Sequence, residues 1–503
     1  MASAALISRY WNREFTHYPD RGTRYKQLLL IVLITVTLYY ELYVVGGVAP
    51  IFLAQLHIPF LTFVYLLAFG ALVGAFGSLF AGLSDRFGRA NLIVYGSLLV
   101  GLITFFWVPN VKTAMSWGIS YAVVSIVEGI VLVATPALIR DFSPQVGRAT
   151  AMGFWTVGPV LGSLAVSSIT TIALPIYQTW QSQFVISGII GLVVFVLAFL
   201  FLRDLSPGLR DQLIVNERDR MLVELRAKGL DTEASLRNPW RQMLHLDIIG
   251  SAIGISVMLL FYLTMVAFGV LYLVMIFQFS TEQANAVLNW IWATNAVTVI
   301  VAGLISDHLR VRKPLMLVGG LGNIVTIYLY LQLVGQHPTY STLVWIGCLQ
   351  TMFAAIAYVS WMASFSETVE ARNPALTATG LAIWGWAIRL VAVASFIAFP
   401  AVVKSVNPLI EAPYYLGAYK EALTTHMTPS ADLLAHVGAI QIAAGALPGE
   451  WRTWFWICIL GVVVFLATIF LVRGRWSPAA ARADEEAHDI AVARELAALQ
   501  QRR

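Results

Sequence analysis

Three ionisable side chains interrupt long apolar stretches of the sequence: Glu41, Glu128 and Arg389. A charge at the centre of such a stretch costs about 2.5–3.5 kcal/mol on membrane-insertion scales, so it usually faces a wet cavity or a partner. A carboxylate in a partly dry cavity can bind and release a proton, and the planar guanidinium fork matches a carboxylate. The three residues together predict a site that handles protons and an organic anion.

Structural interpretations of the same residues remain open. Either glutamate can form a buried ion pair with Arg389 that only sets helix packing, or it can be held by hydrogen bonds in a structural role. Two acids against one base leave one carboxylate over in any pairing. This excess favours a proton-carrying role, and we predict Glu41 and Glu128 as the proton-coupling residues.

The local sequence around the charged residues has helical periodicity. Tyr121, Ser125 and Thr135 lie at offsets of minus seven, minus three and plus seven from Glu128, which places them on one helical face. Trp386 precedes Arg389 by three residues, so its indole can stack on the guanidinium.

The composition predicts the elements that must carry these residues. The chain has 503 residues, of which 59% are hydrophobic and 12% charged, and its mean hydropathy is +0.76. Twelve apolar runs are each long enough for a helical span, and none has the alternating pattern of a barrel strand. We predict an all-α integral membrane protein with 12 transmembrane helices. Cys348 and Cys458 fall inside spans, so no disulfide framework is expected.

Basic residues are distributed unevenly between the two sides of the predicted spans. Of the 32 Lys and Arg, 27 fall on the side that holds both termini, four fall on the other side, and Arg389 is within a span. By the positive-inside rule, both termini are cytoplasmic. The sequence has no Asn-x-Ser/Thr sequon, which is compatible with a bacterial inner membrane, and residues 1–26 lack the features of a signal peptide.

The chain divides into two related halves. A cytoplasmic N-terminal segment, 1–26, precedes a six-helix bundle at 27–202, and a charge-rich cytoplasmic linker, 203–247, leads to a second bundle at 248–472. Asp85 and Asp307 lie in matching loops of the two bundles, 222 residues apart. An internal repeat of this kind is typical of secondary transporters, with the substrate site near the midplane.

Two further segments lie outside the spans. Residues 405–450 form an insertion between the last two spans, and their apolar stretch is too short for a normal span. We expect an ordered extracellular cap over the second bundle. The Ala-, Glu- and Arg-rich segment 473–503 is expected to be a cytoplasmic tail.

The loop motif GLSDRFGR at 82–89, with a partial copy at 303–310, resembles the motif of the major facilitator superfamily. The resemblance covers about residues 25–475, and it extends distantly to the anion:cation symporters through Glu41 and Glu128. It implies that the first, fourth, seventh and tenth spans line a central cavity. It further implies that the motif residues gate the cytoplasmic side: Asp85, Arg86 and Arg89 with Asp141, and Asp307 and Arg310 with Glu367 or Glu370.

The predicted cavity wall is aromatic and carries amide donors. Such a wall favours a substrate with an apolar or ring-containing body. The expected substrate-binding residues are Arg389, Tyr40, Tyr121, Trp155, Asn289, Trp292, Asn295, Tyr358 and Trp386.

The leading functional prediction is a proton-coupled symporter of a small organic anion, a carboxylate, working by alternating access. An alternative is a proton-coupled exporter of lipophilic or cationic compounds, favoured by Gly158-Pro159-x-x-Gly162 and by the lone acid Glu41 in the first span. A non-transporting receptor on the same fold is a third interpretation, against which the two deep acids argue. We expect a monomer that is not an enzyme, with no metal site, no cofactor beyond the proton gradient and no nucleic-acid partner.

Overall fold

The computed structural model describes residues 13–77, 88–143, 155–206, 239–309, 311–373, 377–425 and 428–473, together with 209 and a few positions between 476 and 490. Most of the linker and of the C-terminal segment therefore lie outside the described residues. So do Asp85, Arg86 and Arg310, and the side chain of Asp307.

Within the described part of the chain, twelve helical segments are long and apolar enough to cross a membrane, which confirms the predicted all-α membrane architecture. Those of the first half are α2 (Arg21–Leu56), α3 (Phe60–Gly77), α5 (Arg89–Leu102) with its continuations η2 (Ile103–Trp107) and η3 (Val108–Asn110), α6 (Ala114–Phe142), α8 (Gly158–Tyr177) and α9 (Trp180–Phe201). Those of the second half are α13 (Leu246–Met258) with α14 (Leu260–Phe277), α15 (Thr281–Leu309), α16 (Lys313–Leu333), α17 (Tyr340–Arg372), α18 (Thr377–Val402) and α20 (Ala431–Thr468).

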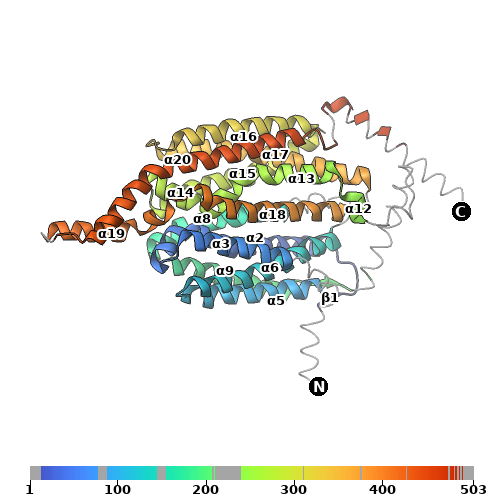
Figure 1. Cartoon of the computed structure of the whole chain (residues 1–503). Coiled ribbons are helices and arrows are strands. Elements are labelled where there is room, and N and C mark those ends of the chain that lie inside the picture. The colour runs from blue at the N-terminus through green and yellow to red at the C-terminus, as the bar shows by residue number, and fades with distance from the viewer. Residues whose placement is uncertain are drawn as a thin grey trace, which may run out of the picture.

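The short elements mark the two ends of the bundle. At one end α19 (Val406–Thr424) projects beyond the spans, and at the other lie β1 (Glu14–Phe15) and the short helix α12 (Pro239–Met243) (Figure 1). We call these the α19 end and the β1 end. Strand β1 pairs in parallel with β2 (Asp204–Leu205), which ties the start of the first half to its last span.

Side-chain caps start several of the spans. Asp20 accepts hydrogen bonds from the backbone of Gly22 and Thr23 ahead of α2, and the Thr23 hydroxyl holds the pKa of this exposed carboxyl below its usual range. Thr113 caps α6 and Thr339 caps α17 in the same way, by accepting a backbone N–H three residues on. These local signals fix where the helices begin.

Glycines set how closely the helices approach. In the first half, a Cβ on Gly129 of α6 would lie only 2.1 Å from the carbonyl oxygen of Gly74 in α3. In the second half, a Cβ on Gly319 of α16 would lie 2.5 Å from the backbone nitrogen of Ala357 in α17. Without a hydrophobic driving force between helices in lipid, such small-residue contacts are the main way that spans pack.

The two halves meet tightly at the α19 end. A Cβ on Gly46 of α2 would lie 2.5 Å from the carbonyl oxygen of Val266 in α14. The amide of Asn285 in α15 donates to the carbonyl oxygen of Gly47 at 2.8 Å. Both contacts join a helix of the first half to one of the second, so they seal the halves together at this end.

The insertion between the last two spans is ordered in helices, as predicted, but the expectation of a cap over the second bundle is wrong. Helix α19 and the first turns of α20 form a hairpin that extends away from the spans (Figure 1). The reason is that α20 runs without interruption from Ala431 to Thr468, past Pro448, so its start is carried outward along the helix axis.

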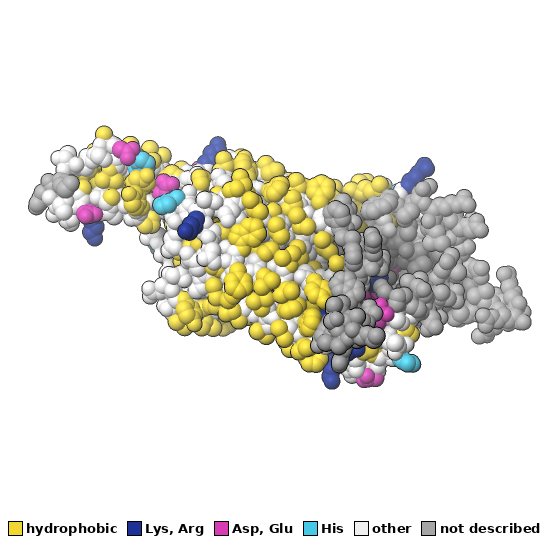
Figure 2. All heavy atoms as spheres, turned by 90° about the horizontal axis from the view of Figure 1, so that it is seen from below, with side chains coloured by type: hydrophobic (Ala, Val, Ile, Leu, Met, Phe, Trp, Pro, Cys, Tyr) yellow, Lys and Arg dark blue, Asp and Glu magenta, His cyan; other side chains and the backbone are white. Residues whose placement is uncertain are grey.

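The surface has the polarity expected of a membrane protein. In the face shown in Figure 2, hydrophobic side chains cover the middle of the molecule, and the charged side chains gather at its two ends and on the hairpin. Large exposed apolar residues, such as Ile172, Val297 and Leu304, lie on the spans and not on connecting loops. This apolar band matches a bilayer-facing surface.

Candidate functional site

The structure brings two of the three predicted charged residues together at the centre of the bundle. Glu128 lies in α6 of the first half and Arg389 in α18 of the second, and the two side chains interact electrostatically. Tyr39 of α2 interacts with both. The site is therefore built by both halves.

Arg389 and Glu128 have no direct protein partner among the residues that the structure describes. Neither side chain makes a hydrogen bond or an ion pair there, although they are close enough to interact electrostatically. The guanidinium lies beside Gly385, where a Cβ would be 3.8 Å from its Nη1 atom. This arrangement leaves the fork of Arg389 free to bind an acidic group from outside the protein.

Tyrosines surround the charged pair. Tyr43 and Tyr39 lie one turn apart on α2, with ring centroids 5.4 Å apart. Tyr262 of α14 and Tyr358 of α17 also interact with Tyr39, and Tyr121 of α6 interacts with Glu128. The site thus offers several phenolic hydroxyls, each of which can donate and accept a hydrogen bond.

Glu41 is not part of this cluster, and the expectation that all three charged residues share one compartment is wrong for it. Its side chain is 4% exposed and lies against α9 of its own half, where a Cβ on Gly191 would be 2.1 Å from Oε1. The Oε1 atom has no hydrogen-bond partner. Glu41 follows Tyr39 by two residues, which rotates it by about 200° around the helix and turns it away from the second half.

The prediction for Tyr40 is also corrected, because this residue follows Tyr39 by one position, a rotation of about 100° around the helix. This side chain is buried in the first half, 2% exposed, and its hydroxyl is unpartnered. The residues of α2 that face the second half are Tyr39, Tyr43 and Gly46, which are spaced by four and three. The aromatic residues of α2 at the site are therefore Tyr39 and Tyr43.

The predicted polar and indole residues divide between the site and the packing around it. Asn289 accepts from the Ser168 hydroxyl at 2.5 Å across the two halves, whereas Asn295 donates to Thr351 within the second half. Trp292 is buried edge-on against Tyr262, with centroids 5.5 Å apart.

Two further tryptophans lie toward the β1 end. Trp155 donates to the Thr135 hydroxyl at 3.0 Å, which links the start of the α8 region to α6. Trp386 meets Phe76 of α3 edge-on, with centroids 6.5 Å apart, so it contacts the opposite half. Trp386 thus helps α18 to contact α3.

One ion pair of the predicted gating set is present in the part of the chain that the structure describes, and its gating role stays a prediction. Arg89 pairs with Asp141 at 2.6 Å, joining the start of α5 to the end of α6 at the β1 end. Glu367 also forms an ion pair, at 3.0 Å, but with Arg312. The predicted partner Arg310 lies outside the described residues.

Two residues at the β1 end were missed by the sequence reasoning. Asp204 accepts from the backbone N–H of Arg89 at 2.7 Å and thereby caps α5, whose own preceding residue is Gly88. Arg372 pairs with Asp247 at 2.7 Å. Two features of the sequence could have indicated these residues. The start of α5 has no capping side chain of its own, and Arg372 and Asp247 are opposite charges at helix ends.

A model of the Major Facilitator Superfamily matches residues 31–395. The chain belongs to this superfamily. Its members are secondary transporters, so the protein is a multi-pass membrane transporter, and the family and fold are not those of enzymes.

Solved structures of Major Facilitator Superfamily transporters share the fold. A bacterial homologue of the human lysosomal transporter Spinster, inward-facing and unoccupied, is 15% identical with a TM-score of 0.67, covering 90% of this chain and 98% of that one. The inward-open xylose transporter XylE of E. coli is 14% identical with a TM-score of 0.59, covering 92% and 99%.

One characterised relative has a carboxylate substrate in its name. A galacturonate transporter of Dickeya chrysanthemi is 21% identical over 239 residues, which is 46% of this chain and 67% of that protein. At 21% identity this match supports membership of the Major Facilitator Superfamily and does not identify the substrate. The substrate class has to be argued from the residues of the site.

Proposed function

We propose that the protein is a proton-coupled symporter of a small organic anion, with Arg389 as the anion-binding residue and Glu128 as the acid nearest the substrate that carries the coupling proton. The observation that carries the proposal is the pairing of these two residues across the halves without direct contact. A guanidinium kept near the membrane centre without a permanent partner is costly, and a carboxylate substrate would supply the missing charge.

The tyrosines favour a hydroxylated or ring-containing acid. Tyr39, Tyr43, Tyr121, Tyr262 and Tyr358 present hydroxyls around the charged pair. A sugar acid would use Arg389 for its carboxylate and the phenols for its hydroxyls. The galacturonate transporter among the relatives makes galacturonate the first compound to test.

Glu41 keeps a proposed role in proton coupling, separate from the substrate. Its carboxyl is buried against α9 with one unpartnered oxygen, so the neutral acid is favoured in this arrangement. It would exchange its proton only when α2 and α9 move apart. Its effect on the substrate would therefore pass through the position of α2.

The exporter alternative loses one of its two supports, the Gly-Pro motif. A Cβ on Gly158 would lie 2.7 Å from Thr35, and a Cβ on Gly162 would lie 2.5 Å from the Cβ of Tyr39. Close packing of α8 on α2 thus explains both glycines of the Gly158-Pro159-x-x-Gly162 motif without an export function.

We also propose that the β1 end is cytoplasmic and the hairpin extracellular. The support is the excess of Arg and Lys in the segments at the β1 end, under the positive-inside rule. For a bacterial cell we further propose the inner membrane as the location, with the proton gradient driving uptake.

A thermal-shift comparison of matched ligands tests the substrate class. Galacturonate and neutral galactose differ at the carboxyl group, so Arg389 should distinguish them. We expect galacturonate to raise the melting temperature of the purified protein and galactose to leave it unchanged. Stabilisation by lipophilic cations and by no carboxylate in the panel would reject the proposal in favour of export.

A further inference from the structure

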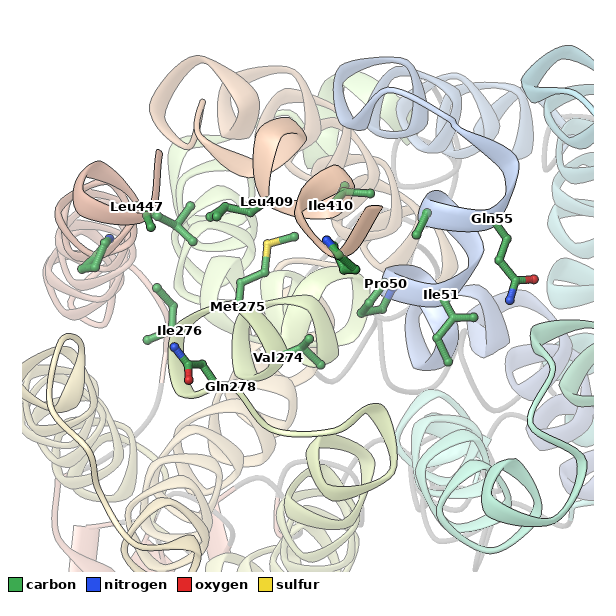
Figure 3. Close-up of a pocket in the computed structure, with 14 residues that line it drawn as sticks. Pro50, Ile51, Gln55, Val274, Met275, Ile276, Gln278, Leu409, Ile410 and Leu447 are labelled. Atoms are coloured by element: carbon green, nitrogen blue, oxygen red, sulfur yellow. The ribbon is translucent and has the colours of Figure 1, made fainter. Parts of the chain in front are cut away.

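A cavity lies at the α19 end, and its lining includes neither Glu128 nor Arg389. Its volume is about 570 Å³, and it is lined by α2 of the first half and by α14, α19 and α20 of the second. Met275 projects from α14 toward Leu409 and Ile410 of α19, and α2 contributes Ile51 to the lining (Figure 3). The size is within the range of ligand pockets, about 300–1,000 Å³.

The chemistry of the lining selects an uncharged occupant. None of the 14 lining residues is ionisable, and the polar side chains among them are Gln55 and Gln278. An anion would lose its hydration here without gaining a cation, so the cavity is a poor site for the proposed substrate. An apolar molecule with a hydrogen-bonding group would bury its body and satisfy a glutamine amide.

The cavity lies next to the seal between the two halves. Gly46 and Val266, where α2 and α14 approach closely, precede its lining residues Pro50 and Val274 by one to two turns. An occupant would contact both halves at once. Alternating access requires the halves to separate at this end, and separation would break those contacts.

The base of the hairpin is fixed on both sides of the cavity. Asn407 of α19 accepts from the backbone N–H of Phe60, the first residue of α3, at 2.5 Å. Glu450 of α20 accepts from the backbone N–H groups of Lys404 and Ser405 at 3.0 and 2.9 Å. The cavity wall formed by α19 is therefore attached to the first half as well as to α20.

We propose that this cavity binds an uncharged, mostly apolar small molecule that holds the α19 end closed and thereby inhibits transport. A ligand that binds one of two conformations shifts the population toward it by its differential affinity. The proposal rests on the alternating access of the superfamily and is independent of the substrate and of the proton coupling proposed above.

The binding test uses a neutral photoreactive probe, a trifluoromethyl aryl diazirine that carries one hydroxyl group. The full chain in lipid nanodiscs is irradiated with increasing probe, and labelled peptides are mapped by mass spectrometry. We expect saturable labelling of peptides that contain Met275 and Leu409. Labelling that rises linearly and spreads over the lipid-facing helices would mean partition into the bilayer only and would overturn the proposal.

The conformational test measures a distance between the halves at the α19 end. Spin labels are placed at Lys112→Cys and His337→Cys, both exposed, after Cys348 and Cys458 are replaced by Ala. We expect the probe to enlarge the short-distance population at the concentrations that saturate labelling. An unchanged distance distribution at saturating probe would refute the inhibitory role.

Two tryptophan variants on one helix provide the matched control. Ala444→Trp fills the cavity, whereas Gly445→Trp projects from α20 where a Cβ meets nothing within 4 Å. We expect Ala444→Trp to weaken probe binding by about tenfold or more and Gly445→Trp to leave it unchanged. If Ala444→Trp does not fold, Ala54→Trp fills the same cavity from α2. Equal probe binding by the cavity-filling and control variants would contradict the proposed site.

Discussion

Replacing Arg389 separates the substrate-binding role from a packing role. In Arg389→Ala a carboxylate ligand loses two charge-assisted hydrogen bonds, each worth about 1.5–3 kcal/mol before compensation by water. We take about 3 kcal/mol as the loss, which corresponds to roughly 150-fold weaker binding. Arg389→Lys keeps the charge without the fork, so we expect about tenfold weaker binding.

Protein stability should respond in the opposite sense. Arg389 makes no ion pair or hydrogen bond with the described residues, so its removal loses only the electrostatic interaction with Glu128 and takes a costly charge out of the membrane centre. We expect Arg389→Ala to melt at or above the wild-type temperature. A structural ion pair would instead cost about 3–5 kcal/mol when one partner is removed.

The assay is equilibrium binding of galacturonate to purified protein, with melting measured on the same samples. Arg372→Ala is the matched control, because it removes an arginine that pairs with Asp247 far from the central site. It should leave affinity unchanged. Arg389→Ala with wild-type affinity and a lowered melting temperature would refute the reasoning and restore the packing interpretation.

Three further predictions concern helix caps, packing and topology. Asp204→Ala removes the cap of α5 and should lower stability by about 1–2 kcal/mol, measured by thermal unfolding. Asp432→Ala, on the exposed hairpin, should leave stability unchanged. Gly129→Ala pushes α6 away from α3 at a cost of about 1–3 kcal/mol of stability and displaces the adjacent Glu128. It should therefore lower both the melting temperature and the transport rate. Gly417→Ala, in open space on α19, should alter neither. Cysteines at Tyr415 and Thr425 should react with an impermeant reagent in intact cells, and reaction only after lysis would invert the proposed topology.

The depth of the functional residues could be predicted from the sequence, whereas their direction could not. Counting from the ends of apolar runs places Glu128 and Arg389 near the middle of their spans, and the structure brings them together. The direction of Glu41 depends on the rotation of α2. A helix that is apolar all round has no polar face to define its rotation, so the contacts of Gly46 and Gly162 with neighbouring helices decide it.

The hairpin and the caps show a different limit. The Ala- and Gly-rich start of α20 was correctly expected to be ordered, but nothing local indicates that the helix continues outward through Pro448. Asp204 caps α5 from a segment more than a hundred residues away. Such contacts depend on how whole helices are arranged, and a single sequence carries little information about them.

Simultaneous measurement of galacturonate and proton fluxes in proteoliposomes tests the central claim most directly. We predict that wild-type protein moves protons inward together with galacturonate and accumulates it when the outside is acidic. Glu128→Gln should abolish the proton flux and the accumulation while leaving galacturonate exchange across the membrane. Proton-linked accumulation that persists in Glu128→Gln, or galacturonate movement without any proton flux in the wild type, would contradict the account.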